Sequence, residues 1–152
     1  MRIAKSFRDL NVYGQAQDAA RKIFFLSRQF PPEERYSLTD QIRRSSRAVK
    51  AMIPEAWGRR RYKAVFVNKL DEALGEATET QSWSDDTLNG EYISREEFDA
   101  LDAQYDSISR MLSRMIDRAY DFCKYAASTD YRAFPPRVSE DDPSELDELK
   151  AF

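Results

Sequence analysis

The sequence predicts an all-α protein whose helices pack as a four-helix bundle. Four separate segments repeat apolar residues at the 3.6-residue period that puts them on one face of a helix. Of 152 residues 4 are glycine, and 34% are charged against 41% hydrophobic, which is typical of helices with charged outer faces. A chain of this length can bury a full core as one domain without disulfide or metal staples.

The first helical segment is expected over about residues 9–29. Pro31 and Pro32 end it, because proline lacks the backbone donor and disfavours helix in the residue before it. The residues predicted to form its apolar face are Leu10, Tyr13, Ala16, Ala20, Ile23, Phe24 and Ser27.

The second helical segment is expected over about residues 32–57. Its predicted apolar face comprises Leu38, Ile42, Ser45, Val49, Met52 and Ala56. Pro54 lies inside this segment and is predicted to kink the helix or to end it a few residues early.

The third segment, about residues 62–88, ends at Asn89-Gly90, where glycine suits the C-terminal cap. Its predicted apolar face comprises Phe66, Leu70, Ala73, Ala77, Thr80 and Ser84. Gly75 lies among small residues of this segment, which indicates a close approach of another helix at a cost in helix stability of roughly 1 kcal/mol.

The fourth segment begins at Ser94, whose side chain is expected to cap the helix together with Glu97 in a capping box. Its apolar face is Phe98, Leu101, Tyr105, Ile108, Leu112, Met115, Ala119, Phe122 and Ala126. We expect one unbroken helix of more than 30 residues, a length that favours bundle packing and an oligomer interface beyond it. Cys123 beside this face is predicted to be a small core residue.

The chain is expected to divide into a bundle, residues 1–127, and a disordered acidic tail, residues 128–152. The tail contains three prolines and carries 3 basic and 7 acidic residues. No apolar run approaches the roughly 18 residues of a membrane span, and the N-terminal residues form no signal peptide. With a single cysteine, these features indicate a cytoplasmic protein.

The absence of histidine excludes many enzyme classes. It removes histidine-dependent triads, histidine general bases and histidine-containing metal sites. The four glycines form neither a dinucleotide-binding nor a Walker motif. We therefore predict a non-enzymatic protein with no catalytic residues, no cofactor and no metal.

Positive charge is concentrated between residues 35 and 63, which contain nine basic and two acidic residues in a chain of net charge −3. This basic strip predicts a surface for nucleic acid, with Trp57 and Tyr62 as stacking platforms for bases. Its candidate nucleic-acid-binding residues are Arg43, Arg44, Arg47, Lys50, Arg59, Arg60, Arg61 and Lys63. Residues 64–127 hold 6 basic and 14 acidic residues, so the alternative is that the strip pairs with acidic helices of the same or a neighbouring subunit.

A remote alternative is a Mg²⁺-dependent nucleotide hydrolase. Two carboxylate pairs at helical i, i+3 spacing, Glu76 with Glu79 and Glu96 with Asp99, offer oxygen ligands of the kind that Mg²⁺ prefers. Glu96 also lies in a first helical turn, where an acid favours the helix dipole without any ligand. No lysine-rich phosphate clamp accompanies these pairs.

Several motifs over roughly residues 6–120 resemble the bacterial four-helix bundle family, also called 23S rRNA intervening-sequence proteins. The matching residues are Phe7-x-Asp9-Leu10-x-Val12-Tyr13, Phe30-Pro31-Pro32-x-Glu34-x-Tyr36-x-Leu38, Gln41-Ile-Arg-Arg44, Ala51-x-Ile53-x-Glu55-x-x-Gly58-Arg59, Phe66-x-x-x-Leu70-x-x-Ala73-Leu-Gly75-x-x-x-Glu79 and Tyr92-Ile93. The chain departs from the family where it has Ala48, Met52 and Ala56 in place of Ser, Asn and Gly.

The resemblance implies a left-handed up-down-up-down bundle that assembles as a ring, commonly a pentamer, without enzymatic activity. The family is similar in turn to the accessory bundle protein of diversity-generating retroelements. This second similarity implies binding of RNA or DNA and of a reverse transcriptase through a basic surface. Glu55 and Glu79 match recurrent acids of the family. We expect them to form ion pairs with Arg44 or Arg59 at a bundle or subunit interface.

Overall fold

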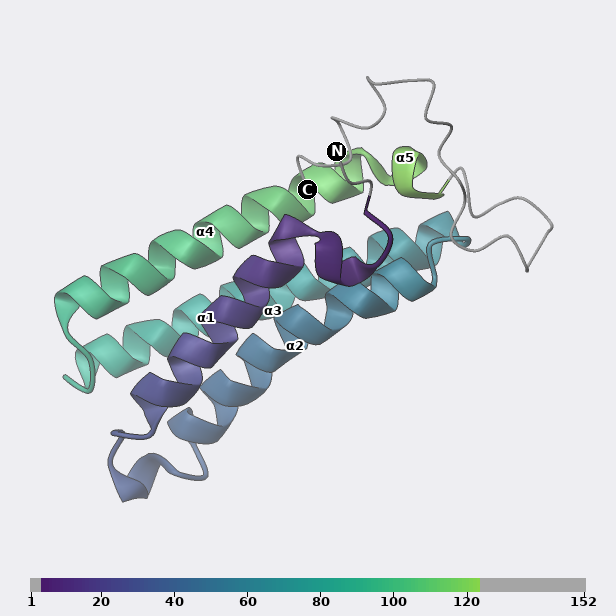
Figure 1. The fold of residues 1–152 in the computed structure, drawn as a ribbon. Helices are drawn as coiled ribbons and strands as arrows, with labels where there is room; N and C mark the ends of the chain where they lie inside the picture. The colour runs from purple at the N-terminus through teal and green to yellow at the C-terminus, as the bar shows by residue number, and fades with distance from the viewer. Residues whose placement is uncertain (1–3, 124–152) are drawn as a thin grey trace.

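The computed structural model describes residues 4–123 and shows a bundle of four long helices (Figure 1). The long helices are α1 (Asn11–Ser27), α2 (Leu38–Gly58), α3 (Lys63–Asn89) and α4 (Arg95–Asp117), followed by the short α5 (Ala119–Cys123). Consecutive long helices pack against each other, and α4 returns to pack against α1. The predicted all-α four-helix bundle is therefore confirmed. No helix among the described residues is long and apolar enough to cross a membrane.

The chain enters α1 through a short 3-10 helix, η1 (Phe7–Asp9), rather than beginning the α-helix at Asp9 as predicted. The Ser6 side chain accepts a hydrogen bond from the Arg8 backbone N–H. The Asp9 carboxylate accepts from the backbone N–H groups of Lys5 and Ser6. These bonds satisfy backbone donors before Leu10, so α1 begins two residues later than expected.

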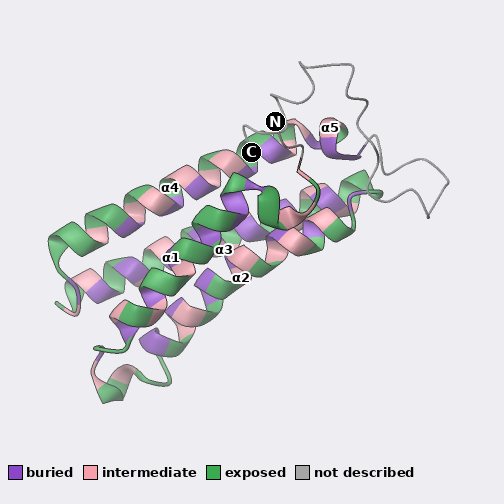
Figure 2. Cartoon of the chain, in the orientation of Figure 1, coloured by how far each residue is buried: buried purple, intermediate pink, exposed green. Residues whose placement is uncertain are grey.

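The core lies along the predicted apolar faces, as the buried stripes in Figure 2 show. All six residues predicted for α3 are buried, and the predicted face of α4 and α5 is buried from Leu101 to Phe122. On α1 the buried stripe includes Val12 and Ala19, whereas Ala20 and Phe24 are only half-buried. Phe24 therefore lies at the edge of the core.

The second helix begins later than its sequence predicts. Residues Pro32–Glu34 form a separate 3-10 helix, η2, so α2 begins at Leu38 and not near Pro32. Pro54 is predicted to kink the helix or to end it a few residues early, and the structure shows that α2 does not end early but continues to Gly58. Buried residues on both sides of the proline, Val49, Ile53 and Ala56, hold this last turn against the core.

The fourth predicted helix is broken into two. Helix α4 ends at Asp117, and Arg118 adopts a non-helical conformation before α5. The Arg118 guanidinium donates to the Asp121 carboxylate (2.6 Å), and the Phe122 ring stacks on Phe66 with centroids 5.5 Å apart. The apolar face thus continues into the core across the break, and Cys123 is buried as predicted. Ala126 and the predicted tail lie outside the described residues.

Candidate functional site

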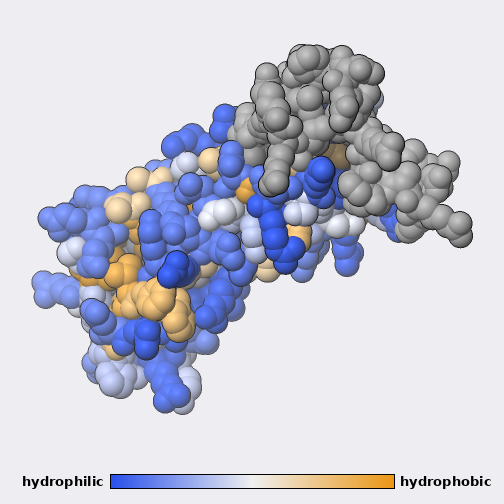
Figure 3. All heavy atoms as spheres, in the orientation of Figure 1, coloured by the Kyte–Doolittle hydropathy of each residue, from blue (hydrophilic) through white to orange (hydrophobic). Residues whose placement is uncertain are grey.

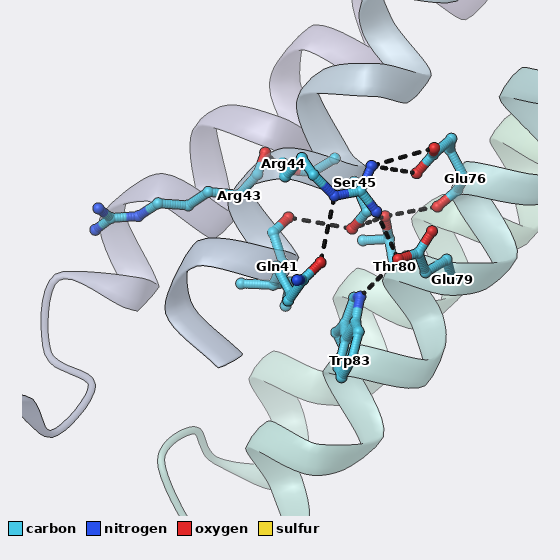
Figure 4. Close-up of polar contacts among 10 residues, drawn as sticks. Gln41, Arg43, Arg44, Ser45, Glu76, Glu79, Thr80 and Trp83 are labelled. Carbon is cyan, nitrogen blue, oxygen red and sulfur yellow. Dashed lines mark hydrogen bonds and ion pairs between the residues drawn. The ribbon is translucent and has the colours of Figure 1, made fainter. Parts of the chain in front are cut away.

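The basic strip of α2 divides between two sides of the helix. Neighbouring residues of an α-helix point about 100° apart, so Arg43 and Arg44 cannot share a face. Arg44 points toward α3, and Arg43 points away from it (Figure 4). The two predicted outcomes, pairing with acidic helices and an open basic surface, are therefore both realised by different residues.

Arg44 is neutralised by α3. Its guanidinium donates to Glu79 (2.6 Å) and to Glu76 (3.3 Å), and the Trp83 indole N–H donates to Glu79 as well (3.2 Å; Figure 4). Burial opposes ionisation of Glu79, but the hydrogen bonds from Arg44 and Trp83 outweigh it and hold the pKa of Glu79 below its ordinary value. The bonds from Glu79 and Glu76 raise the pKa of Arg44. The predicted pairing of Glu79 with Arg44 is confirmed.

Arg43 faces the boundary between α1 and α2. Its Nε donates to the Ser27 hydroxyl (2.7 Å), and its guanidinium lies 5.0 Å from the centroid of the Phe24 ring. Within residues 4–123 its two terminal nitrogens have no carboxylate partner. Arg47 and Lys50, four and seven residues further along, also form no ion pair with any described residue. These three cations form the part of the strip within α2 that no described carboxylate neutralises.

Helix α1 adds cations and aromatic rings that the prediction did not include. The guanidinium of Arg21 lies 5.6 Å from the Phe25 ring, and that of Arg28 lies 5.9 Å from both phenyl rings. Arg47 reaches the Phe24 ring from α2 at 5.7 Å. Figure 3 shows apolar atoms gathered over the C-terminal half of α1 with hydrophilic atoms around them. The signal was present in the sequence as the helical spacing of Arg21, Phe24, Phe25 and Arg28.

Between α1 and α2 lies an open groove of about 550 Å³. It is lined by Gly14, Gln17, Asp18, Ala20, Arg21, Phe24, Arg47 and Lys50. The acid, Asp18, accepts from Gln104 (2.9 Å) and pairs with Lys22 (3.0 Å). These two bonds lower the pKa of Asp18, so it is ionised and already matched by Lys22 at neutral pH. The groove therefore keeps the positive charge of its three cations.

The arginine run after α2 contains one residue that cannot serve as predicted. Arg60 is 4% exposed, lies 4.0 Å from the Trp57 ring and donates to the Trp57 carbonyl (2.6 Å). Burial lowers the pKa of Arg60 to about 10, so it remains protonated at neutral pH. Arg60 is therefore not exposed to a phosphate as predicted, and its guanidinium lies over the ring of the half-buried Trp57. Arg59, Arg61, Tyr62 and Lys63 are exposed, with Arg61 4.7 Å from the Tyr62 ring.

The remaining predicted residues lie away from this groove. Glu55 is exposed and pairs with Lys69 of α3 (3.3 Å), not with an arginine. Gly75 is exposed, and a Cβ there would meet no atom within 4 Å, so no described helix approaches it closely. That part of the prediction for Gly75 is wrong within residues 4–123.

The carboxylate pairs of the hydrolase alternative have other partners. Glu76 and Glu79 bind Arg44, while Asp99 pairs with Arg95 (3.2 Å) in the first turn of α4. In the part of the chain that the structure describes, no three acidic or thiol side chains gather as they would around a metal ion. These carboxylates act as ion-pair and helix-terminus groups.

The described residues thus form a four-helix bundle with a basic groove between α1 and α2. Residues 8–114 match the model of a family described as 23S rRNA-intervening sequence protein, and the chain belongs to this family. Among solved structures it is similar to a protein of unknown function from the S23 ribosomal protein family of Bacteroides thetaiotaomicron. The two are 31% identical with a TM-score of 0.64, over 70% of this chain and 95% of the other. No curated protein matches the chain.

Proposed function

We propose that this protein is a non-enzymatic, cytoplasmic binding module that assembles as an oligomer and engages nucleic acid through the basic face of α2. The residues at the centre of this surface are Arg43, Arg47 and Lys50. The observation that supports the proposal is that these three cations, unlike Arg44, have no carboxylate partner among the described residues. Unpaired cations on one helix face are what a phosphate backbone needs.

The surface extends toward the turn between α2 and α3. Arg59, Arg61 and Lys63 are exposed there and add positive charge beyond the central three residues. The rise of an α-helix places Arg43 and Lys50 about 10 Å apart along the axis, so several phosphates of one strand can contact the face together. Binding of this kind releases counterions and weakens steeply as salt increases.

A second candidate is a structural ring protein, in which the same cations pair with acids of a neighbouring subunit. The acidic excess of residues 64–127 favours this alternative, because most of those acids lie on α3 and α4 and α2 carries the opposite charge. Both candidate functions include assembly as an oligomer, in the form of a pentameric ring. Only the nucleic-acid-binding candidate also includes a reverse transcriptase-like enzyme as a further partner.

The two candidates differ in the effect of charge reversal. We would combine Arg43→Glu with Arg47→Glu and measure mass by light scattering, and affinity for a fluorescent oligonucleotide at two salt concentrations. The matched control is Arg110→Glu with Arg114→Glu, which makes the same charge change at exposed i, i+4 positions of α4.

Nucleic-acid binding predicts that the α2 variant keeps its mass and loses at least tenfold in affinity for the oligonucleotide. Its salt slope should fall by about 1.4 on a single strand for the two lost contacts. The α4 control should retain most of the affinity. Loss of the oligomer in the α2 variant alone would support the structural ring. Equal affinities for both variants, or no salt-dependent binding by the wild type, would reject the proposed function.

A further inference from the structure

We infer that the α1–α2 groove binds unpaired nucleotides of a single strand, with bases stacked on Phe24 in its lining and on the adjacent Phe25, and phosphates held by Arg21, Arg47 and Lys50. This inference rests on the proposed function and names its ligand. It moves the centre of binding from the surface of α2 alone to the groove that α2 shares with α1.

Cations line the groove from both sides. Arg21 is on α1, while Arg47 and Lys50 are on α2, and the open groove between them has a volume of about 550 Å³. The α1 positions from Gly14 to Phe24 span about 15 Å along the helix, a length that suits a short stretch of strand rather than one ion.

The two phenylalanines supply flat apolar surface beside these cations. Phe25 is 48% exposed and Phe24 is half-buried at the rim, with ring centroids 5.5 Å apart in an edge-to-face arrangement. Because Phe25 is exposed at the edge of the bundle, its ring contributes little to the core. Bases stack on such rings, and they also stack on the planes of arginine side chains.

The guanidinium groups are already arranged around the rings. Arg43 is held 5.0 Å from the Phe24 centroid by its bond to the Ser27 hydroxyl, and Arg47 lies at 5.7 Å. The Ser27 hydroxyl is itself fixed because it donates to the Phe24 carbonyl (3.0 Å). A nucleotide that enters can therefore place its base against ring and guanidinium while its phosphate contacts the terminal nitrogens.

A single strand fits this surface better than a duplex or an acidic helix of another protein. The bases of a duplex are stacked inside it, so a duplex can use the cations but not the rings. Acidic side chains can likewise neutralise the cations, but they present no ring to Phe24 and Phe25. An unpaired nucleotide presents a π face and a negative charge together.

The test compares a 12-nucleotide single strand with a 20-base-pair duplex at one salt concentration. The main variant is Phe24→Leu with Phe25→Leu, which keeps apolar side chains and the net charge but removes both rings. The matched control is Tyr36→Leu, because Tyr36 is 84% exposed and stacked by Arg35 at 5.3 Å, outside the groove. A second variant, Gly14→Leu, adds a bulky side chain to the groove lining at a position where a Cβ would meet no atom within 4 Å, and it leaves every ring and cation in the sequence.

The double phenylalanine variant should lose about tenfold or more in affinity for the single strand, and little for the duplex. Gly14→Leu should also weaken the single strand, and Tyr36→Leu should leave both affinities unchanged. Circular dichroism and light scattering of each variant separate these effects from loss of fold.

Several outcomes would overturn the inference. If both phenylalanine and glycine variants bind the single strand like wild type, while Arg43→Glu with Arg47→Glu does not bind, nucleic-acid binding stands and the groove is wrong. If the phenylalanine variant alters the oligomer mass without nucleic acid, a second copy of the chain occupies the groove. If wild type binds neither strand nor duplex, the inference and the proposed function fail together.

Discussion

Ser45 and Thr80 show what single residues of the apolar faces do. Both are buried, and Thr80 Oγ1 donates to Ser45 Oγ (2.8 Å) across the contact between α2 and α3. Sequence spacing placed both residues on the core face, although they are polar. The spacing could not show that the two side chains meet. They lie 35 positions apart in the chain, and their contact depends on how α2 and α3 are aligned along each other.

The Glu79 carboxylate predicts a pH dependence of stability. The pKa of Glu79 is lower in the folded state than in the unfolded state, where it is near 4.5. Its ionised carboxylate therefore stabilises the fold at pH values above the unfolded pKa, and this stabilisation is lost as the pH falls through the folded-state pKa. The side chain is 36% exposed, and solvent screening keeps this contribution small. We expect Glu79→Gln to lower the free energy of unfolding by about 0.5–1 kcal/mol at pH 7 and by much less at acid pH.

Urea unfolding followed by tryptophan fluorescence at both pH values measures this effect. Asp85→Asn is the control, because Asp85 is exposed on the same helix and has no ion pair with any described residue. If Glu79→Gln lowers the free energy of unfolding equally at pH 7 and at acid pH, the carboxylate charge is not the cause of the loss.

At the scale of elements, periodicity predicted which helices form but not where each begins and ends. Asp9 and Pro32 both suit helix N-termini by residue type, yet 3-10 turns occupy these positions. The alternation of apolar residues from Leu101 to Phe122 continues across Arg118, so it carried no sign that α4 ends at Asp117. The apolar side chains stay buried on both sides of Arg118 although the backbone leaves the helical conformation there. Periodicity indicates which side chains are buried and does not indicate where a helix ends.

Helix α3 contains a glycine that offers a test of the interface prediction. Gly75 is exposed, and a Cβ there has room within the described chain. Gly75→Ala should therefore raise the free energy of unfolding by about 0.5–1 kcal/mol, because alanine loses less backbone entropy in a helix. Thermal unfolding measures the gain.

Light scattering on the same variant tests whether a neighbouring subunit contacts this surface. An oligomer that forms normally would show that no second chain approaches Gly75 closely. A weakened oligomer, with the isolated bundle still stabilised, would place Gly75 in a subunit interface.

At the scale of the whole molecule, charge is distributed unevenly. The chain has net charge −3, yet residues 128–152 alone carry 3 basic and 7 acidic residues. Removing them leaves 21 basic and 20 acidic residues, and the α2 surface then acts in a nearly neutral molecule. Because electrostatic attraction of a polyanion depends on the total field, we expect deletion of residues 128–152 to strengthen nucleic-acid binding at low salt.

A titration with the same oligonucleotide at low and high salt measures this change. A full-length variant with the seven acids replaced by their amides separates charge from length and should behave like the deletion. Unchanged affinity in both variants would mean that the acidic residues do not oppose binding.

The sequence by itself determined the four helices, the buried faces of α3 and α4, and the concentration of cations on α2. These features depend on residue spacing along one element, which is a local property. The tertiary structure alone decided which cations remain open. Arg44 is neutralised because α3 presents Glu76 and Glu79 to it, and Arg60 is buried against Trp57. Arg43 and Arg47 instead meet the Phe24 ring of α1, and Lys50 lines the groove beside it, because charge on a helix becomes a surface or an ion pair only through its neighbours.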